Sequence, residues 1–226
     1  MRTIIYLFAA LYAASLSVPS LAHHPGQKLD QVMGSKERYF QAIDKKAPDF
    51  SLQDADGRPV SLAGFRDKVV VLHFVYGRCP DICPLHAERI AEVQEMIDQT
   101  PMKDLVQFVT ITTDPKNDTV DVMRDYGPAH GLKPGNWMFL TTMPRQPEEA
   151  TRKLAEQFGH KFLKAEDGYQ THSVVTHVIE KGGRWAANFH GLRFEPVNLV
   201  LYLNGLTNTP PKHPEPNIWD KMKGLF

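Results

Sequence analysis

The sequence contains very little cysteine. Only Cys79 and Cys83 occur among 226 residues, and they lie four positions apart. Small secreted scaffolds use several cysteines spread along the chain to close long loops. A bridge between these two would close almost no loop and would stabilise the fold little. The sequence therefore excludes a disulfide-stapled scaffold, and it indicates that the two thiols are present for their chemistry.

The chain also lacks an excess of charge of either sign. It has 26 Lys and Arg residues against 26 Asp and Glu residues, so its formal net charge is zero. A nucleic-acid-binding protein usually shows a basic excess or a basic stripe, and we therefore expect no nucleic-acid partner. Hydrophobic residues make up 42% of the chain, enough for one domain with a sizeable core.

Long apolar runs are scarce, but one lies near the start of the sequence. Residues Ile4–Leu16 are apolar, Arg2 precedes them, and Ser20 and Ala22 are small residues of the kind that a signal peptidase reads. We predict that residues 1–22 form a signal peptide. The alternative is an uncleaved anchor in the inner membrane, since the run approaches the ~20 residues that a spanning helix needs. In either case we expect the bulk of the protein in the periplasm.

The predicted organisation is one domain between two irregular segments. Residues 23–46 are polar with no sustained period, which predicts a flexible lead-in. The domain is expected over residues 47–205. The tail over residues 206–226 is rich in proline and is expected to be extended or irregular.

Strand and helix patterns alternate along this domain. Two short alternating stretches flank Asp56-Gly57, which predicts a β-hairpin at the start of the domain. The apolar run 69–75 predicts a central strand that is buried on both faces, and a helical pattern follows it. The other expected elements are strands at 106–112, 137–140, 173–180 and 184–189 and helices at 119–126, 147–158 and 195–203. This order predicts an α/β fold with a mixed central sheet flanked by helices.

The two cysteines lie where the central strand gives way to a helix. If both residues open that helix, they lie on one face with Cβ atoms about 5–6 Å apart, and the sulfurs of Cys79 and Cys83 can converge. Such a pair can form a disulfide or chelate one soft metal ion. The free N–H groups and partial positive charge of a helix N-terminus favour the thiolate form that both reactions need.

The thiol count narrows the choice of metal. Thiolates select copper(I), zinc or iron–sulfur centres. Iron–sulfur clusters usually take four cysteines, and structural zinc sites usually take four Cys or His ligands. Copper accepts low coordination. The residues therefore favour copper first, metal-free thiol redox chemistry second and zinc third.

A third ligand to such a metal would be a histidine. His86 follows Cys83 by three positions and shares its helix face, although a polar residue on a partly exposed face is the simpler interpretation. His172 opens a strand that is expected to return beside the central strand. His177 points to the opposite face, and His73 is expected to be buried in the central strand. From the residues alone, His86 and His172 both remain open as the ligand.

Several segments of the chain together match a known pattern. They are Ala47-Pro48-Asp49-Phe50-Ser51-Leu52, Phe74-Val75-Tyr76-Gly77, Cys79-Pro80-Asp81-Ile82-Cys83-Pro84, Thr112-Thr113-Asp114-Pro115 with Asp118-Thr119, Trp137-Met138-Phe139-Leu140 and Tyr169-Gln170-Thr171-His172-Ser173. In these segments the chain resembles the Sco/SenC family of copper proteins. The resemblance covers about residues 47–205, in the order found in the family.

The resemblance implies a thioredoxin-like fold and a copper site made by Cys79, Cys83 and His172, in which the two cysteines can also form a redox-active disulfide. The implied task is maturation of the CuA centre of cytochrome c oxidase, by supplying copper, by reducing the cysteines of that centre, or both. The implied partners are the copper-bearing oxidase subunit and a further copper chaperone. The loop at Asp114 lies near the copper site in the family, although a turn or capping role explains that residue equally well.

Export adds one more expected partner. An oxidising compartment tends to close a Cys79–Cys83 disulfide, whereas copper needs both sulfurs as thiolates. We therefore predict a periplasmic thiol reductase that acts on this protein.

The main alternative is a metal-free thiol–disulfide oxidoreductase of the thioredoxin type. Thioredoxins have two residues between their cysteines and a proline that faces them, whereas three residues separate Cys79 from Cys83 and no proline adjoins His172. A peroxiredoxin would carry Thr or Ser three residues before its reactive cysteine, and Tyr76 stands there instead. The sequence thus favours a copper chaperone and leaves open whether it also acts as a reductase.

Overall fold

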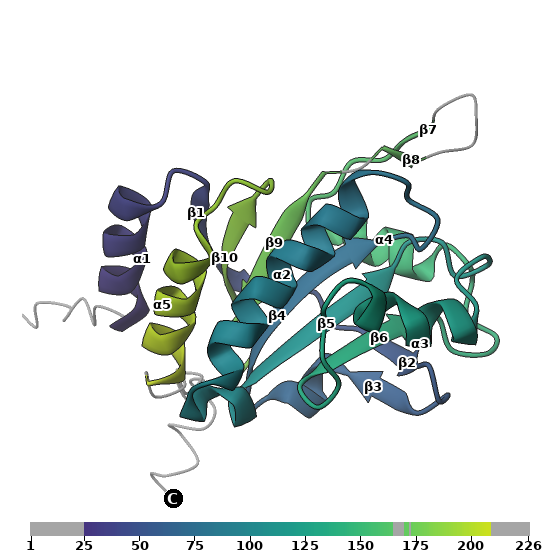
Figure 1. Cartoon of the computed structure of the whole chain (residues 1–226), viewed down its shortest axis with the longest axis horizontal. Coiled ribbons are helices and arrows are strands. Elements are labelled where there is room, and N and C mark those ends of the chain that lie inside the picture. Colours follow the sequence, from purple (N-terminus) through teal and green to yellow (C-terminus); the bar gives the residue numbers. More distant parts are fainter. Residues whose placement is uncertain (1–24, 165–169, 172, 209–226) are drawn as a thin grey trace, which may run out of the picture.

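The computed structural model describes residues 25–164, 170–171 and 173–208. An eight-stranded mixed sheet forms its centre, in the order β1-β10-β9-β4-β5-β6-β2-β3 (Figure 1). The strands are β1 (Phe40–Lys46), β2 (Ser51–Asp54), β3 (Pro59–Ser61), β4 (Val69–Val75), β5 (Val106–Thr112), β6 (Trp137–Thr141), β9 (Val175–Ile179) and β10 (Arg184–His190), while β7 (Leu163–Lys164) and β8 (Gln170–Thr171) form a separate pair. The helices are α1 (Pro25–Lys36), α2 (Ile82–Asp98), α3 (Val120–Ala129), α4 (Ala150–Gln157) and α5 (Pro196–Thr207), with short 3-10 helices η1 (Leu62–Phe65) and η2 (Pro101–Asp104).

Strand β4 is the central strand that the sequence predicts. It pairs with parallel β5 on one side and antiparallel β9 on the other, and all seven of its residues are buried because a core cluster covers each face of the sheet. A strand covered on both faces needs apolar residues at nearly every position rather than at alternate ones. The continuous run Val69–Val75 therefore fixes the middle of the sheet.

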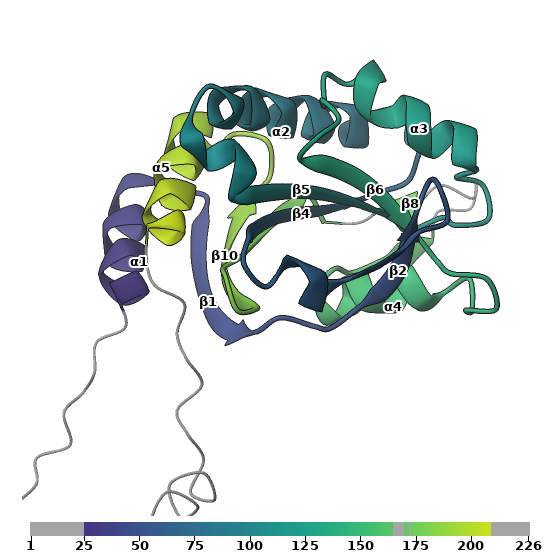
Figure 2. The same ribbon diagram turned by 90° about the horizontal axis from the view of Figure 1, so that it is seen from below.

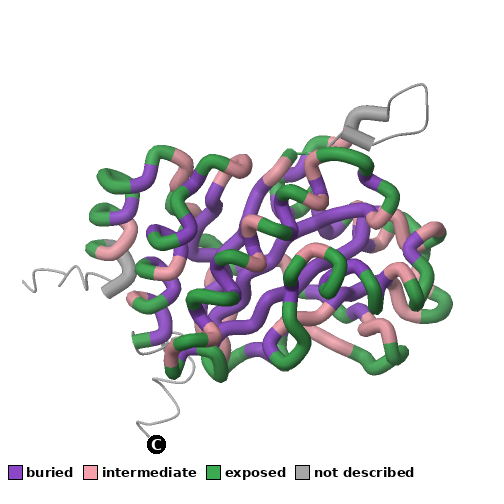
Figure 3. The backbone as a smooth tube through the Cα atoms, in the orientation of Figure 1, coloured by how far each residue is buried: buried purple, intermediate pink, exposed green. Residues whose placement is uncertain are grey.

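Helices cover both faces of the sheet. Helices α1, α2, α3 and α5 lie over one face, and α4 with η1 lies over the other (Figure 2). Successive residues of β4 point to opposite faces, so Val71 belongs to the core under α2 and Leu72 belongs to the core over α4. Buried backbone follows the sheet and the inner sides of the helices, and exposed backbone lies mainly at loops and outer helix turns (Figure 3).

The predicted hairpin is present at one edge of the sheet. Strands β2 and β3 pair in antiparallel fashion, with Leu52 opposite Val60. Gly57 in the turn has a φ of 77°, a conformation that glycine adopts without strain. The hairpin joins the sheet through the pairing of β2 with β6.

The prediction of a flexible lead-in over residues 23–46 was wrong for the part that the structure describes. Residues 25–46 form α1 and β1. Strand β1 pairs with β10, and Met33 of α1 is buried in the core that α5 shares. Both elements gain their stability from partners that lie about 150 residues away, which a search for local periodicity does not detect. The other boundary at 205 was also short, because α5 continues to Thr207.

The remaining predicted elements are confirmed, with shifted ends. Helix α4 begins at Ala150 rather than 147, and Gly159 follows it with a φ of 86°. Helix α2 begins at Ile82, so Cys79 precedes it. No helix among the described residues is long and apolar enough to cross a bilayer. The predicted signal peptide, residues 1–22, and the tail beyond residue 208 lie outside the described residues.

Candidate metal centre

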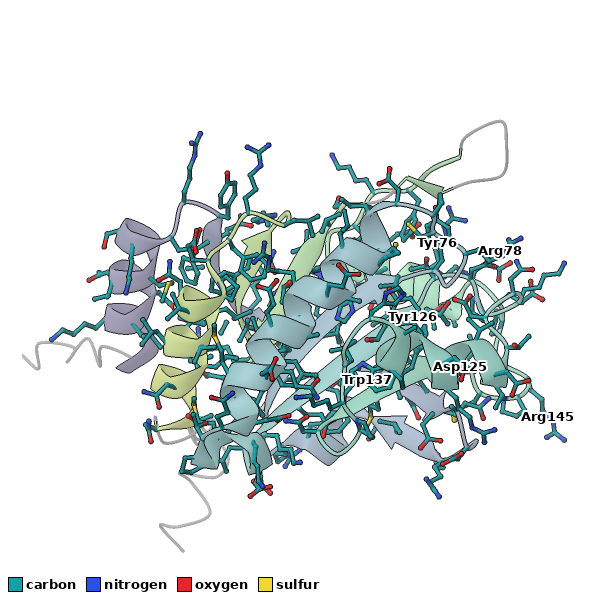
Figure 4. All side chains as sticks on the ribbon, in the orientation of Figure 1. Tyr76, Arg78, Asp125, Tyr126, Trp137 and Arg145 are labelled. Carbon is teal, nitrogen blue, oxygen red and sulfur yellow. The ribbon has the colours of Figure 1, made fainter. Side chains whose placement is uncertain are left out.

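The two cysteines lie where β4 ends and α2 begins. Tyr76 and Arg78 mark this end of the molecule in Figure 4. The Cys79 N–H donates to the Tyr76 carbonyl at 3.0 Å, which closes a turn directly after β4. Cys83 is the second residue of α2. Of the two cysteines, only Cys83 thus lies in the helix, and Cys79 occupies the turn before it.

The two cysteines are buried, form no disulfide with each other and lie within hydrogen-bond reach of each other. The Cys83 backbone N–H donates to the Cys79 Sγ at 3.3 Å. This donor is one of the first N–H groups of α2, which have no carbonyl partner within the helix. The helix N-terminus thus directs a donor at the Cys79 sulfur, and the Cys83 side chain also lies within hydrogen-bond reach of that sulfur.

The environment shifts the pKa values of the two thiols in opposite directions. Burial acts to raise the pKa of Cys79, but hydrogen bonds from the Cys83 side chain, from backbone N–H groups and from Tyr76 outweigh it and hold that pKa below its ordinary value. Burial raises the pKa of Cys83 far above its ordinary value, and the neighbouring Cys79 adds to the rise. Cys79 is therefore the readier thiolate and nucleophile of the pair.

Helix α3 supports the first turn of α2 from the side. The Tyr126 hydroxyl donates to the Cys83 carbonyl at 3.1 Å. Burial raises the pKa of Tyr126 well above its ordinary value, and the nearby thiols add to the rise. The phenol therefore remains protonated and keeps donating to the backbone beside Cys83.

The loop after β5 lies against the cysteine turn. Arg78 donates to Asp114 at 3.2 Å, and the Asn117 side chain donates to both Asp114 oxygens. Farther in, Asp118 is buried and accepts hydrogen bonds from the backbone of Gly77. The Asp114 carboxylate has the turn-forming role that the sequence allowed for, and it also brings this loop to the residue before Cys79.

The proposed third ligand, His172, lies outside the described residues. Its neighbours in the described chain are Thr171, which ends β8, and Ser173. Strand β9 is antiparallel to β4, with Leu72 opposite His177, so the chain enters β9 at the end of the sheet where β4 leads into the cysteine turn. Among the described residues, no group of three or more His, Cys, Asp or Glu side chains comes together as a metal site.

His86, the competing ligand, is a core residue. It is 2% exposed, its Nε2 lies 2.9 Å from the Thr176 hydroxyl, and its ring packs edge to face on His73 with centroids 5.0 Å apart. The expectation of a partly exposed polar residue was wrong, because the buried face of α2 includes position 86 along with Cys83 and Ile90. The expectation that His73 is buried is confirmed.

His177 belongs to a second group of buried histidines on the opposite face of the sheet. Its Nδ1 lies 2.8 Å from the Asn188 Oδ1, and its Nε2 lies 2.8 Å from the His160 Nε2. The Trp185 indole N–H, which can only donate, also reaches the Asn188 Oδ1 at 2.9 Å. That oxygen is thus an acceptor, so His177 carries its proton on Nδ1 and accepts from His160 at Nε2.

The sequence-based reasoning did not predict the contacts of two buried polar residues, His160 and Asp118. His160 follows α4, and nothing in its local sequence indicates a partner on β9. Asp118 stands beside the helix cap Thr119, where an acidic residue is common, so its local sequence indicates capping rather than contact with the cysteine turn. Both contacts join segments that are distant along the chain.

The chain is similar to several known proteins. It is 36% identical over 120 residues to the mitochondrial SCO2 homolog of Mus musculus. These residues make up 53% of this chain and 47% of that protein. The chain thus spans about half the length of that relative. It is 26% identical to the solved structure of Arabidopsis thaliana ScoI with copper bound, with a TM-score of 0.60 over 71% of this chain and 98% of that one.

A third comparison concerns the fold. The structure of a SCO1/SenC family lipoprotein from Bacillus anthracis matches with a TM-score of 0.67 and 21% identity, over 74% of this chain and 98% of that one. The predicted thioredoxin-like α/β fold is therefore confirmed. The family model described as SCO1/SenC matches residues 40–199, well over half of the sequence, and the chain belongs to the SCO1/SenC family.

Proposed function

We propose that this protein carries copper on Cys79, Cys83 and His172 and delivers it to the copper-bearing subunit of cytochrome c oxidase for assembly of the CuA centre. The observation that carries the proposal is the pair of buried cysteines at the junction of β4 and α2, which form no disulfide with each other. Copper-bound relatives of the same fold, such as the Arabidopsis ScoI structure, support it. Copper is here a cargo that the protein accepts and releases.

The donor set fits copper(I). Two thiolates are soft ligands, and copper(I) accepts the low coordination number that two sulfurs and one imidazole provide. Cys79, whose pKa is lowered, gives up its proton more readily than Cys83, whose pKa is raised. Because both sulfurs bind as thiolates, loading would depend on pH.

The second candidate function is thiol–disulfide reduction, and the unequal pKa values of the two thiols favour it. The Cys79 thiolate would attack one sulfur of a target disulfide and release the other as a thiolate. Cys83, once deprotonated, would attack the Cys79 sulfur in this mixed disulfide and release the second target thiol. The target gains two electrons, and this protein is left with a Cys79–Cys83 disulfide that a periplasmic reductase must open again.

The test is an anaerobic copper(I) titration of the fully reduced protein beside single variants. Cys79→Ala, Cys83→Ala and His172→Ala are expected to lose tight binding of one equivalent, because each removes a ligand. His86→Gln is the matched control, since it changes a histidine one turn from Cys83 that bonds to Thr176, and it is expected to bind as the wild type does.

Two results would overturn these assignments. Unchanged binding by His172→Ala together with loss in His86→Gln would transfer the third ligand to α2. A wild-type protein with no copper affinity but fast exchange with disulfides would replace the copper function by the reductase function.

The place of action follows from the first residues of the sequence. We propose that residues 1–22 export the chain and that it acts in the periplasm, where the CuA-bearing subunit, a thiol reductase and a further copper chaperone would meet it. The residues Arg2, Ile4–Leu16 and Ala22 support this proposal by their order and composition.

A further inference from the structure

Asp118 is a buried carboxylate that the copper chemistry proposed above does not use. It is 2% exposed, and it lies at the end of the loop that joins β5 to α3. Each of its two oxygens accepts from the Gly77 backbone N–H at 3.0 Å, and the Thr112 hydroxyl donates to one of them. A buried carboxylate is costly unless such donors surround it, so its place beside Gly77 needs a reason.

The contact is so close that residue 77 can have no side chain. A Cβ atom on Gly77 would lie 2.6 Å from the Asp118 Oδ1 and 2.6 Å from the Val122 Cγ1. Gly77 does not need to be glycine for its φ angle, since it is not among the residues with positive φ. Glycine is required here by the approach of Asp118.

The backbone that Asp118 holds leads directly to the first cysteine. Gly77 lies between Tyr76, whose carbonyl accepts from the Cys79 N–H, and Arg78, which bonds to Asp114. Among the contacts of this turn, the bond from the Gly77 N–H is made to both oxygens of a buried carboxylate. Hydrogen bonds to a charged acceptor are about twice as strong as neutral ones.

We propose that Asp118 is a positioning residue for the Cys79 sulfur. By fixing the Gly77 backbone it sets the place of Cys79 relative to Cys83, and so it tunes both copper affinity and the ease with which the two thiols form a disulfide. The inference rests on the proposed function for its copper part, but its disulfide part stands without any metal.

A purely structural carboxylate is the alternative, and the chain contains a matched control for it. Glu37 is 4% exposed and accepts from the backbone N–H groups of Tyr39 and Glu195 at 3.0 Å and from Asn198 at 2.9 Å. It has the same kind of surroundings as Asp118, but it joins α1 to α5 rather than touching the cysteine turn. Glu37→Gln and Asp118→Asn therefore make the same chemical change at two different places.

The experiment compares these two variants with the wild type in three measurements. The first is the copper(I) dissociation constant of the reduced protein, determined by competition with a chromophoric copper(I) chelator. The second is the equilibrium between the Cys79–Cys83 dithiol and its disulfide in glutathione buffers without metal. The third is the midpoint of urea unfolding. Asp118→Asn is expected to raise the copper dissociation constant by about 10- to 100-fold, as loss of a group that orients a metal ligand usually does, and to shift the disulfide equilibrium.

Glu37→Gln is expected to lower the urea midpoint while leaving copper binding and the disulfide equilibrium at wild-type values. If both variants changed all three quantities alike, or if Asp118→Asn left the disulfide equilibrium unchanged, the inference would be overturned. A wild type that fails to bind copper would remove the proposed function, yet the metal-free disulfide equilibrium would still decide the role of Asp118.

A milder variant covers the case in which Asp118→Asn does not fold. Thr112→Val removes the hydroxyl that donates to Asp118 and leaves the carboxylate beside Gly77. It is expected to shift the disulfide equilibrium in the same direction by a smaller factor. A wild-type equilibrium in Thr112→Val, with Asp118→Asn unfolded, would count against the proposal.

Discussion

The two ends of the molecule use the same kind of interaction for different purposes. At the end with the cysteines, Asp118 accepts from the Gly77 backbone. At the other end, where α1 and α5 lie side by side (Figure 1), Glu37 accepts from backbone N–H groups of Tyr39 and Glu195. A buried carboxylate thus holds backbone in both places, and its role depends on what the held segment carries, which is a reactive sulfur in one case and only neighbouring helices in the other.

The largest loss of stability in this comparison is expected from a variant at the end without cysteines. Arg184 donates to both oxygens of the buried Glu180, at 2.6 and 2.9 Å, and also reaches Asp44 of β1 at 3.1 Å. Arg184→Met leaves the Glu180 charge buried without its guanidinium, which typically costs about 3–5 kcal/mol of unfolding free energy. Urea unfolding measures this loss, and the copper affinity of the folded variant is expected to be unchanged. A large loss of copper affinity would show that the two ends are coupled.

A pair of glycine variants gives the next largest effect. A Cβ on Gly205 of α5 would lie 2.6 Å from the Leu29 side chain of α1, much as a Cβ on Gly77 would meet Asp118. Overpacking of this kind usually costs about 1–3 kcal/mol, so Gly205→Ala and Gly77→Ala are both expected to unfold at lower urea concentration. Only Gly77→Ala is expected to weaken copper(I) binding. Equal copper affinities in the two variants would break the distinction between the ends.

Acid is expected to destabilise the region between the two ends. His73 is fully buried in β4, and burial lowers its pKa to about 3. The unfolded chain takes up this proton near pH 6.5, so between the two values the unfolded state binds more protons. The contribution of the neutral His73 to the free energy of unfolding is therefore fully present above pH 6.5. It falls as the pH is lowered, by about 2 kcal/mol at pH 5.

The variant His73→Leu isolates this contribution. It is expected to reduce by about 2 kcal/mol the difference in urea-unfolding free energy between pH 7 and pH 5. The Thr110 hydroxyl would keep its bond from the Trp137 indole in this variant. An unchanged pH dependence would mean that His73 is not the group that resists protonation, and the neighbouring histidines would have to account for it.

The sequence predicted those elements that a few neighbouring residues are enough to specify. The apolar run of β4, the turn at Gly57 and the glycine after α4 each specify a strand, a hairpin or a helix end within a few residues. The position of the two cysteines at the junction of β4 and α2 could also be predicted, because they follow the apolar run of β4 directly in the sequence.

What the sequence could not reveal depends on contacts between distant segments. Strand β1 has an irregular burial pattern and is held by backbone pairing to β10. His86 is buried because β9 places Thr176 opposite it. The bond from Gly77 to Asp118 spans 41 positions. None of these partners can be read from the residues around it, since only the folded sheet brings them together.

The arrangement of His177 has a consequence for the proposed copper function. Its Nδ1 proton is committed to Asn188, and its Nε2 lone pair is occupied by the proton of His160. An imidazole can bind a metal only through a lone pair that is not already in use. Both ring nitrogens of this buried histidine are therefore engaged in hydrogen bonds, and His177 would not compete with the proposed site for copper.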